Sequence, residues 1–397
     1  MKNKLKKRGI IFPDDSSVYI DEDINIDNIH TGTIIHPGCR ISGKHTSIGP
    51  DCEIGYESPV TIRNCQIGQG VKISGGFLEE TVILDYATAG DGFHSRPGTI
   101  LEEKSSVAHT VGLKQTILMP YVVLGSTINF CDIIMGGGTG SDNHSEVGSS
   151  YIHFNFTTHQ DKATASLLGD VPNGVMLDKN PIFLGGQGGL VGPRRIAFGT
   201  TVAAGIILRR DITEENLLIA KNENNAVMSD RSYNYRQYGS VKDKISNCFN
   251  YLGNLLALKS WYMYVRKPFF SRTGYGVNCF NGAVKCLDCI WQERIYRLDQ
   301  LAAKFELSIK SAGNNIAEEH FLQQQDFINN WPDIKKNLEC LYNKESSPEY
   351  PIMEIISKLK SQSGQYLDAV KNLSKKDSAI LTEWLNKVGQ TPVIGFN

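Results

Sequence analysis

The sequence predicts an all-β, left-handed parallel β-helix built from hexapeptide repeats, followed by an α-helical C-terminal domain. Three observations support this fold class. Aliphatic residues recur every six positions, small residues follow them, and the periodicity becomes helical after about residue 212. An interval of six matches neither the 3.6-residue period of an α-helix nor the alternation of a strand. It is the period of a β-helix in which each block supplies one short strand and one corner.

The most regular part of the repeat lies near the end of the predicted prism. Its lead residues, spaced by six without a slip, are Leu184, Leu190, Ile196, Val202 and Leu208. The small residues that directly follow three of them are Gly185, Ala197 and Ala203. We expect each lead side chain to point into the prism, and each small residue to permit the tight turn at a corner.

The same pattern occurs earlier in the chain. It comprises the pairs Ile48-Gly49, Ile54-Gly55, Ile67-Gly68 and Ile73-Ser74. Between about Ile34 and Ile212 these repeats predict roughly ten coils of about eighteen residues. Stacked at the ~4.8 Å spacing of neighbouring strands, they would form a prism roughly 45–50 Å long. A β-sandwich is the alternative, but its turns should recur every ~8–12 residues and its strands should alternate.

Four segments follow from these patterns. They are an N-terminal segment (1–29), the β-helix (30–212), a connector (213–240) and an α-helical domain (241–397). Helical spacing begins with Ile245, Phe249, Leu252 and Leu256. Further helices are expected around Glu318–Leu341 and Ile352–Val388, the latter with a break near Ser374–Asp377. The complete switch of periodicity also predicts that the helices are separable from the prism.

Composition limits the classes of partner and location. A net charge of −1 gives no electrostatic reason to expect nucleic acid or a membrane as partner. No stretch approaches the ~20 apolar residues of a membrane span. The basic start is interrupted by Pro13-Asp14-Asp15 before a signal peptide could form, so we expect a cytoplasmic protein. Nine scattered cysteines do not suggest a disulfide framework, and Cys286 and Cys289 suit a helix face better than a metal site.

The main interruption of the repeat, Asp91–Lys162, is where chemistry is expected. It contains Arg96-Pro97-Gly98, Lys114 and the glycine run Gly136–Gly140. It also holds five of the nine histidines: His94, His109, His144, His153 and His159. Cations together with imidazoles suit an anionic substrate and a proton-transfer step.

In this tract the chain resembles the acetyltransferase half of the bifunctional N-acetylglucosamine-1-phosphate uridylyltransferase/glucosamine-1-phosphate acetyltransferase family, over roughly residues 30–212. That family has an Arg-Pro-Gly segment followed eighteen residues later by a lysine, and Arg96 and Lys114 match both. The resemblance implies that these two cations hold a sugar phosphate. It also implies substrate-binding roles for Asn155 and Lys162, and an acetyl-CoA site at the coils that contain Ala203, Ala204, Gly205 and Arg210.

Two departures from the family concern its chemistry. The family's catalytic histidine stands twelve residues after the phosphate lysine, where this chain has Ser126, and the neighbouring tyrosine is replaced by Asn129. We keep Asn129 among the expected substrate-binding residues. About one extra hexapeptide lies between Gly125 and Gly148. The nucleotidyltransferase half of the family has no counterpart, so no uridylyltransferase activity is expected.

The first functional hypothesis is an acyltransferase that uses acetyl-CoA and acts on an amino-sugar phosphate or a nucleotide-linked sugar. Arg96, Lys114 and Lys162 would hold the acceptor, and His153 or His144 would act as general base. Because His153 alternates with Ile152 and Phe154, we expect its side chain to face outward.

The alternative hypothesis is a non-catalytic phosphosugar or sugar-nucleotide binding protein on the same scaffold. Ser126 favours this alternative, whereas the preserved coils around Ala203 favour the enzyme. A purely structural trimer would leave the spacing of the two cations unexplained. A homotrimer is expected for either function, because the family places its sites between neighbouring prisms.

Overall fold

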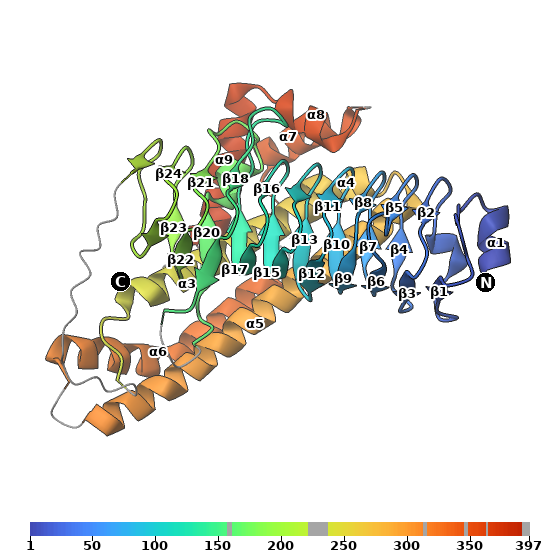
Figure 1. Cartoon of the computed structure of the whole chain (residues 1–397). Helices are drawn as coiled ribbons and strands as arrows, with labels where there is room; N and C mark the ends of the chain where they lie inside the picture. The colour runs from blue at the N-terminus through green and yellow to red at the C-terminus, as the bar shows by residue number, and fades with distance from the viewer. Residues whose placement is uncertain (157–160, 221–236, 313–315, 345–347, 363, 391–397) are drawn as a thin grey trace.

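The computed structural model describes residues 1–156, 161–220, 237–312, 316–344, 348–362 and 364–390. It shows a parallel β-solenoid of about 11 turns with a layer of α-helices along one side (Figure 1). Neighbouring coils are joined by parallel pairing, as between β3 and β6, β12 and β15, and β21 and β24. The predicted fold class, a β-helix followed by a helical region, is confirmed.

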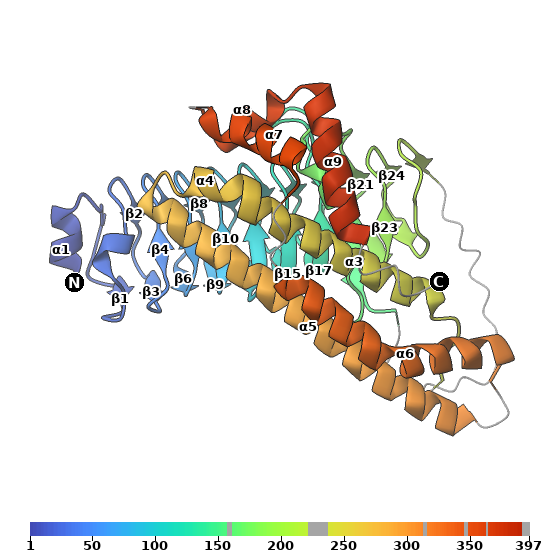
Figure 2. The same cartoon turned by 180° about the vertical axis from the view of Figure 1, so that it is seen from behind.

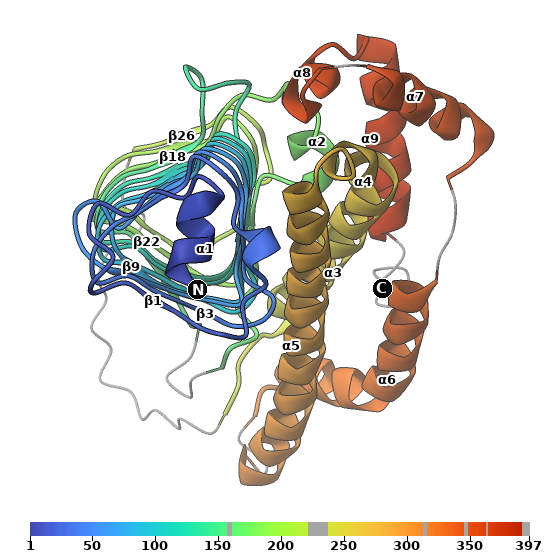
Figure 3. The same ribbon diagram turned by 90° about the vertical axis from the view of Figure 1, so that its right-hand side faces the viewer.

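The prism has three faces, seen end-on in Figure 3. The ten-stranded face consists of β2 (Ile34–Ile35), β5 (Glu53–Ile54), β8 (Lys72–Ile73), β11 (Thr88–Ala89), β14 (Ser106–Val107), β16 (Val123–Leu124), β18 (Glu146–Val147), β21 (Phe183–Leu184), β24 (Thr201–Val202) and β26 (Leu218–Ile219).

The other two faces share one sheet. The Arg96 face contains β1 (Tyr19–Ile20), β3 (Arg40–Ser42), β6 (Val60–Arg63), β9 (Gly76–Glu79), β12 (Phe93–Arg96), β19 (Ile152–Phe154), β22 (Gly189–Val191) and β25 (Ile207–Leu208). The helix-covered face contains β4 (Ser47–Ile48), β7 (Gln66–Ile67), β10 (Thr81–Ile83), β13 (Thr99–Leu101), β20 (Ser166–Leu168) and β23 (Arg195–Ile196).

Two seven-residue strands, β15 (Gly112–Leu118) and β17 (Asn129–Met135), run from one of these faces into the other. Each turns the corner at a residue with a left-handed backbone, Gln115 (φ 47°) in β15 and Asp132 (φ 63°) in β17. The side chains of both corner residues are buried. They therefore need polar partners, which the helices supply.

The lead residues of the repeat fill the prism, as predicted. The interior includes Ile48, Ile54, Ile67, Ile73, Leu184, Leu190, Ile196, Val202 and Leu208, all at most 4% exposed. The solenoid extends past both predicted bounds of the β-helix, since β1 pairs with β3 in one sheet and β24 pairs with β26 in the other. Of the expected connector, residues 221–236 lie outside the described part of the chain.

The helices begin with three short ones: α1 (Lys2–Lys7), the 3₁₀ helix η1 (Ile26–Asn28) and α2 (Val171–Gly174). The C-terminal layer comprises α3 (Lys242–Trp261), the π-helical η2 (Tyr262–Arg266), α4 (Lys267–Phe270), α5 (Gly274–Ala312), α6 (Glu318–Asn343), α7 (Tyr350–Ser361), α8 (Tyr366–Lys371) and α9 (Lys375–Gln390). The segment predicted as Ile352–Val388 thus has a second break, after Ser361. No helix in the described residues is long and apolar enough to cross a membrane.

One face of the prism is apolar on both sides. Its strands carry adjacent apolar pairs, of which one member points inward and the other packs against helices. The outward members are Val82, Ile100, Ile117, Ile134 and Leu167. Helix α5 packs on β4, β7, β10 and β13, and α3 packs on β20; Figure 2 shows both helices running obliquely along the prism. Prism and helices therefore share a core, which argues against the expectation that they are separable.

Two buried arginines tie the helices to the corners of this face. Arg294 of α5 donates to Asp132 (2.7 Å) and Gln115 (2.9 Å), the left-handed residues at the corner with the Arg96 face. At the opposite corner, Arg266 of η2 donates to Glu102 (2.6 Å) and to Glu103. Both guanidiniums are almost fully buried. Removing either partner of such a pair would leave an uncompensated buried charge.

A chain that ends at residue 215 is expected to aggregate, because truncation exposes the outward residues of the helix-covered face. Each fully buried aliphatic side chain contributes about 1.5–3 kcal/mol by being removed from water. Light scattering of the truncated chain should show large particles. The same truncation carrying Val82→Thr, Ile100→Thr and Ile117→Thr should scatter less. A monodisperse unmodified truncation with a β-type circular dichroism spectrum would show that the prism does not need its helices.

Candidate functional site

Arg96 and Lys114 lie side by side on neighbouring coils. Arg96 ends β12, and the parallel register pairs it directly with Lys114 of β15, which is paired in turn with Cys131 of β17. Residues paired across parallel strands point to the same side, with backbones ~4.8 Å apart. The eighteen-residue spacing of the two cations is therefore one turn of the solenoid. It places both side chains on the same surface.

The surroundings of the two cations differ. Arg96 is exposed, with its Nη2 atom 3.6 Å from the Cys131 sulfur. The Lys114 side chain is 27% exposed, and its ammonium lies 3.7 Å from a carboxylate oxygen of Glu293 on α5. Burial alone would raise the pKa of Glu293, but its hydrogen bond with Arg297 and the nearby positive charges outweigh burial and lower that pKa. An ionised carboxylate from the helical layer therefore belongs to this site.

An imidazole lies next to the position where the family has its histidine. His109, at the corner before β15, has its Nδ1 atom 2.9 Å from the hydroxyl of Ser126. The two corners are also joined by a hydrogen bond from Thr127 N to His109 O (3.1 Å). Three residues after Ser126, Asn129 is exposed at the start of β17. The seventeen-residue spacing of His109 and Ser126, again about one coil, is the sequence signal that would have found this pair.

His94 belongs to the same surface. It is exposed on β12, two residues before Arg96, and its ring stacks on Phe77 of β9 at a centroid distance of 5.1 Å. The surface between His109 and Arg96 therefore offers imidazoles at one end and a cation pair at the other. Two adjacent cations favour an anion such as a phosphate through charge-assisted hydrogen bonds.

The expectation that His153 faces outward is wrong. Its neighbours Ile152 and Phe154 are the exposed residues of β19, at 39% and 38%. The His153 Nδ1 atom lies 2.5 Å from the Cys131 carbonyl, which can only accept, so Nδ1 carries the proton. Its Nε2 atom lies 2.9 Å from the Ser166 hydroxyl. Burial lowers the pKa of His153, and both ring nitrogens are engaged within the chain.

His144 is not brought to the cation pair. It lies in the loop before β18, a strand of the ten-stranded face, whereas Arg96 and Lys114 belong to the Arg96 face. Its Nδ1 atom is 2.7 Å from the Ser141 carbonyl, and its Nε2 atom is 3.6 Å from Glu146.

Two of the expected substrate-binding residues flank a gap in the described chain. Asn155 is exposed directly after β19, and Lys162 is exposed while its carbonyl accepts a hydrogen bond from Arg294 (2.9 Å). His159 lies between them, outside the described residues. The contact with Arg294 places the Lys162 backbone close to α5, near the corner that Arg294 secures.

The expected coenzyme residues lie on later coils. Ala203 and Ala204 follow β24, and Arg210 follows β25. Gly205 has a left-handed backbone (φ 78°) and donates to the Gly186 carbonyl (2.9 Å). Strands β17, β19 and β22 separate β25 from the Lys114 strand. The structure therefore does not bring these residues beside the cation pair within one chain.

Comparison with known proteins agrees with the solenoid. No family model matches the chain. The chain is 30% identical over 224 residues to the bifunctional protein GlmU of Pelobacter propionicus, which covers 55% of this chain and 42% of that protein. It is 29% identical over 215 residues to the bifunctional protein GlmU of Thermotoga petrophila, covering 54% and 43%. The chain thus spans less than half the length of the relatives it matches.

Acidification is expected to destabilise the protein partly through His153. A histidine whose pKa is lowered by folding binds fewer protons in the native state, so its contribution to stability is lost as the pH falls below its unfolded value of about 6.5. The His153→Gln variant keeps a hydrogen-bond donor and acceptor at this position. Its free energy of unfolding should decrease less between pH 7 and pH 5 than that of the parent protein. Urea titrations at several pH values measure this slope. The exposed His45→Gln is the matched control, and an unchanged slope in His153→Gln would contradict the assigned environment.

Proposed function

We propose, from the similarity of this solenoid to the GlmU proteins, that the chain is an acyltransferase that acetylates the amino group of a phosphosugar with acetyl-CoA. One observation carries the proposal. Arg96 and Lys114 stand one coil apart on the same surface, with imidazoles at the other end of that surface. A nucleotide-linked sugar fits the same cations through its phosphates.

The acceptor phosphate would lie between the Arg96 guanidinium and the Lys114 ammonium. Glu293 already pairs with Lys114, so the phosphate must either displace this carboxylate or bind against its repulsion. The helical layer therefore sets the affinity of the acceptor site as well as covering the prism. Lys162 and Asn155 would complete the acceptor site from the segment near α5.

The geometry favours His109 over His153 and His144 as the general base. With Nδ1–H donating to Ser126, the Nε2 lone pair of His109 is available to a substrate, and no partner for Nε2 is found among the described residues. A base in this position takes the amine proton as nitrogen attacks the thioester carbonyl. Ser126 would orient the ring and hold the required tautomer. Ala203, Ala204, Gly205 and Arg210 would bind the coenzyme on a later coil, in keeping with a site shared between chains of a homotrimer.

A second candidate function is a non-catalytic binding protein for a phosphosugar or a sugar nucleotide. The specific observation that favours it is Ser126, since the chain has no imidazole at the position of the family's base. In that case the cation pair keeps its role, and the pair of His109 and Ser126 contributes only polar contacts. Transfer assays separate the two functions, whereas acceptor binding does not.

Acceptor binding should depend on both cations. A charge-assisted contact is worth about 1.5–3 kcal/mol, so Arg96→Ala or Lys114→Ala should weaken binding of glucosamine 1-phosphate by roughly tenfold to a hundredfold. Glu293→Gln should strengthen it several-fold, because a competing negative charge is removed. Isothermal titration calorimetry measures all three, with Arg63→Ala, an exposed cation on the same face, as control. If none of the three variants differs from the parent, the similarity to GlmU extends only to the scaffold.

Acetyl transfer should depend on His109. The His109→Ala variant should transfer the acetyl group about 10²–10⁴-fold more slowly, because a general base accelerates the reaction by that factor. Its affinity for the acceptor should be unchanged. In this background, Ser126→His should restore part of the rate by returning an imidazole to the family position. The rate is measured as coenzyme A release. A full loss in His144→Ala or His153→Gln, with His109→Ala active, would reassign the base.

A further inference from the structure

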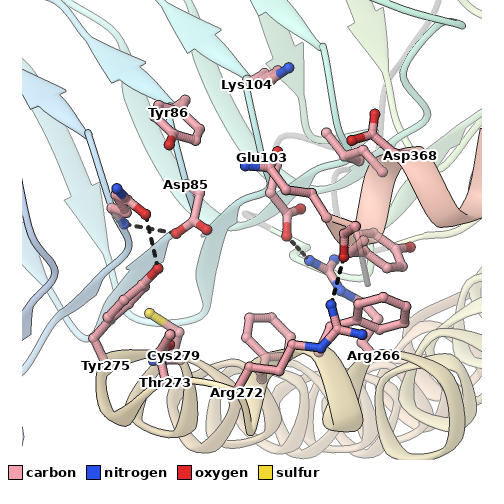
Figure 4. A pocket seen from close by; sticks show the side chains of 18 residues that line it. Asp85, Tyr86, Glu103, Lys104, Arg266, Arg272, Thr273, Tyr275, Cys279 and Asp368 are labelled. Atoms are coloured by element: carbon pink, nitrogen blue, oxygen red, sulfur yellow. Dashed lines mark hydrogen bonds and ion pairs between the residues drawn. The ribbon is translucent and has the colours of Figure 1, made fainter. Parts of the chain in front are cut away.

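A cavity of about 710 Å³ lies where the helical layer meets a corner of the prism. Gln69, Asp85, Tyr86 and Glu103 line it from the solenoid, and helical residues including Tyr275 and Phe269 line it from the other side. Figure 4 shows Asp85, Tyr86, Glu103 and Tyr275 around it. This volume is within the usual range of small-molecule sites. The lining residues lie at the corner between the ten-stranded face and the helix-covered face. The cavity is therefore separate from Arg96 and Lys114.

Two carboxylates stand one coil apart on the solenoid side. Asp85 and Glu103 occupy equivalent corners, joined by a hydrogen bond from Lys104 N to the Asp85 carbonyl (3.0 Å). Oδ1 of Asp85 accepts from the backbone N–H of Gln69 (2.7 Å), and its second oxygen is turned toward the cavity (Figure 4). Burial, reinforced by the charge of Glu103, raises the pKa of Asp85 to about 6. Asp85 is thus ionised at neutral pH.

Three cationic side chains also line the cavity, those of Lys104, Arg266 and Arg272. Arg266 is shared by Glu102 and Glu103 and is enclosed by the rings of Tyr262 and Tyr366. Arg272 donates to the backbone carbonyls of Gly364 (2.6 Å) and Gln362 (2.7 Å). Lys104 lies at the rim, apart from the Asp85 carboxylate (Figure 4). None of these three side chains is hydrogen-bonded to Asp85, so the Asp85 carboxylate has no ion pair among the residues that the structure describes.

Aromatic rings form the walls of the cavity next to the Asp85 carboxylate. Tyr86, on the solenoid corner, and Tyr275, at the start of α5, lie on either side of Asp85 (Figure 4). The Tyr275 hydroxyl donates to the Gln69 side chain at 3.3 Å, which fixes its ring. Phe269 adds a further apolar surface. Carboxylates bind an ammonium group, and aromatic faces attract both cations and apolar rings.

We propose that this cavity is a binding site for a small amine that carries a ring, with its ammonium against Asp85 and Glu103 and its ring between Tyr86 and Tyr275. The Asp85 carboxylate distinguishes such a ligand from a neutral one of the same shape. The site is independent of the acyltransferase proposal, because it uses no residue of the Arg96 face. Arylalkylamines and amino sugars share the required chemistry.

Calorimetric titration of the full chain with benzylamine, glucosamine and the neutral isostere benzyl alcohol tests the site. At pH 7.5 at least one amine should bind at least tenfold more tightly than benzyl alcohol. Tighter binding of benzylamine would identify an aromatic ring as the preferred group, and tighter binding of glucosamine a sugar ring. Affinity for the amine should fall as the pH drops below 6, because protonated Asp85 no longer attracts an ammonium group.

Two variants test whether the ligand contacts Asp85 and Tyr86. Asp85→Asn keeps an oxygen acceptor for the backbone N–H of Gln69 and should abolish the preference for the amine. Tyr86→Asn removes the ring, but asparagine suits the left-handed backbone at this residue (φ 61°). The variant should therefore lower the affinity for the amine without unfolding the chain. Glu79→Gln, which removes a carboxylate on the Arg96 face, should leave affinity unchanged. Equal affinity for benzylamine and benzyl alcohol, an Asp85→Asn variant that still prefers amines, or saturable binding of inorganic phosphate with neither amine binding would each overturn the proposal.

Discussion

The apolar outer surface of one face of the prism constrains the rest of the structure. A strand with one side in the prism and the other in water needs only every second residue to be apolar, but β10, β13, β15, β17 and β20 carry adjacent apolar pairs. A contiguous apolar surface of this kind must be covered. Helices α3 and α5 cover it, and the packing merges the outer surface of the prism with the core of the helical layer.

This packing also determines where polar groups of the helices meet the prism. At one corner Arg294 satisfies the left-handed residues Gln115 and Asp132, and the next residue, Glu293, lies beside Lys114. At the other corner Arg266 joins Glu102 and Glu103, next to the cavity around Asp85. Both candidate sites thus lie at the edges of the helix-covered face. The helical layer contributes charged side chains to each of them, Glu293 to one and Arg266 to the other.

Features that depend only on the length of a repeat or a coil could be predicted from the sequence. A six-residue period identifies inward side chains, and an eighteen-residue spacing places Arg96 beside Lys114. The same logic would have paired His109 with Ser126, seventeen residues apart, and the apolar pairs such as Ile117-Leu118 would have revealed a covered face. The orientation of His153 was missed because Ile152 and Phe154, although apolar, are the outward residues of that strand.

Other features could not be predicted from local patterns. Glu293 lies 179 positions after Lys114, and Tyr275 lies 190 after Asp85. Their positions depend on where α5 crosses the prism. That crossing follows from packing of the whole layer, for which no short motif exists.

The central claim is that the prism and its helices are one folding unit. Native-state hydrogen exchange tests it directly, since amides of α5 and of β10 to β17 should exchange through the same global opening, with equal free energies and equal dependence on denaturant. Exchange of α5 through a separate opening of lower free energy, while the strands of the helix-covered face remain protected, would contradict the account.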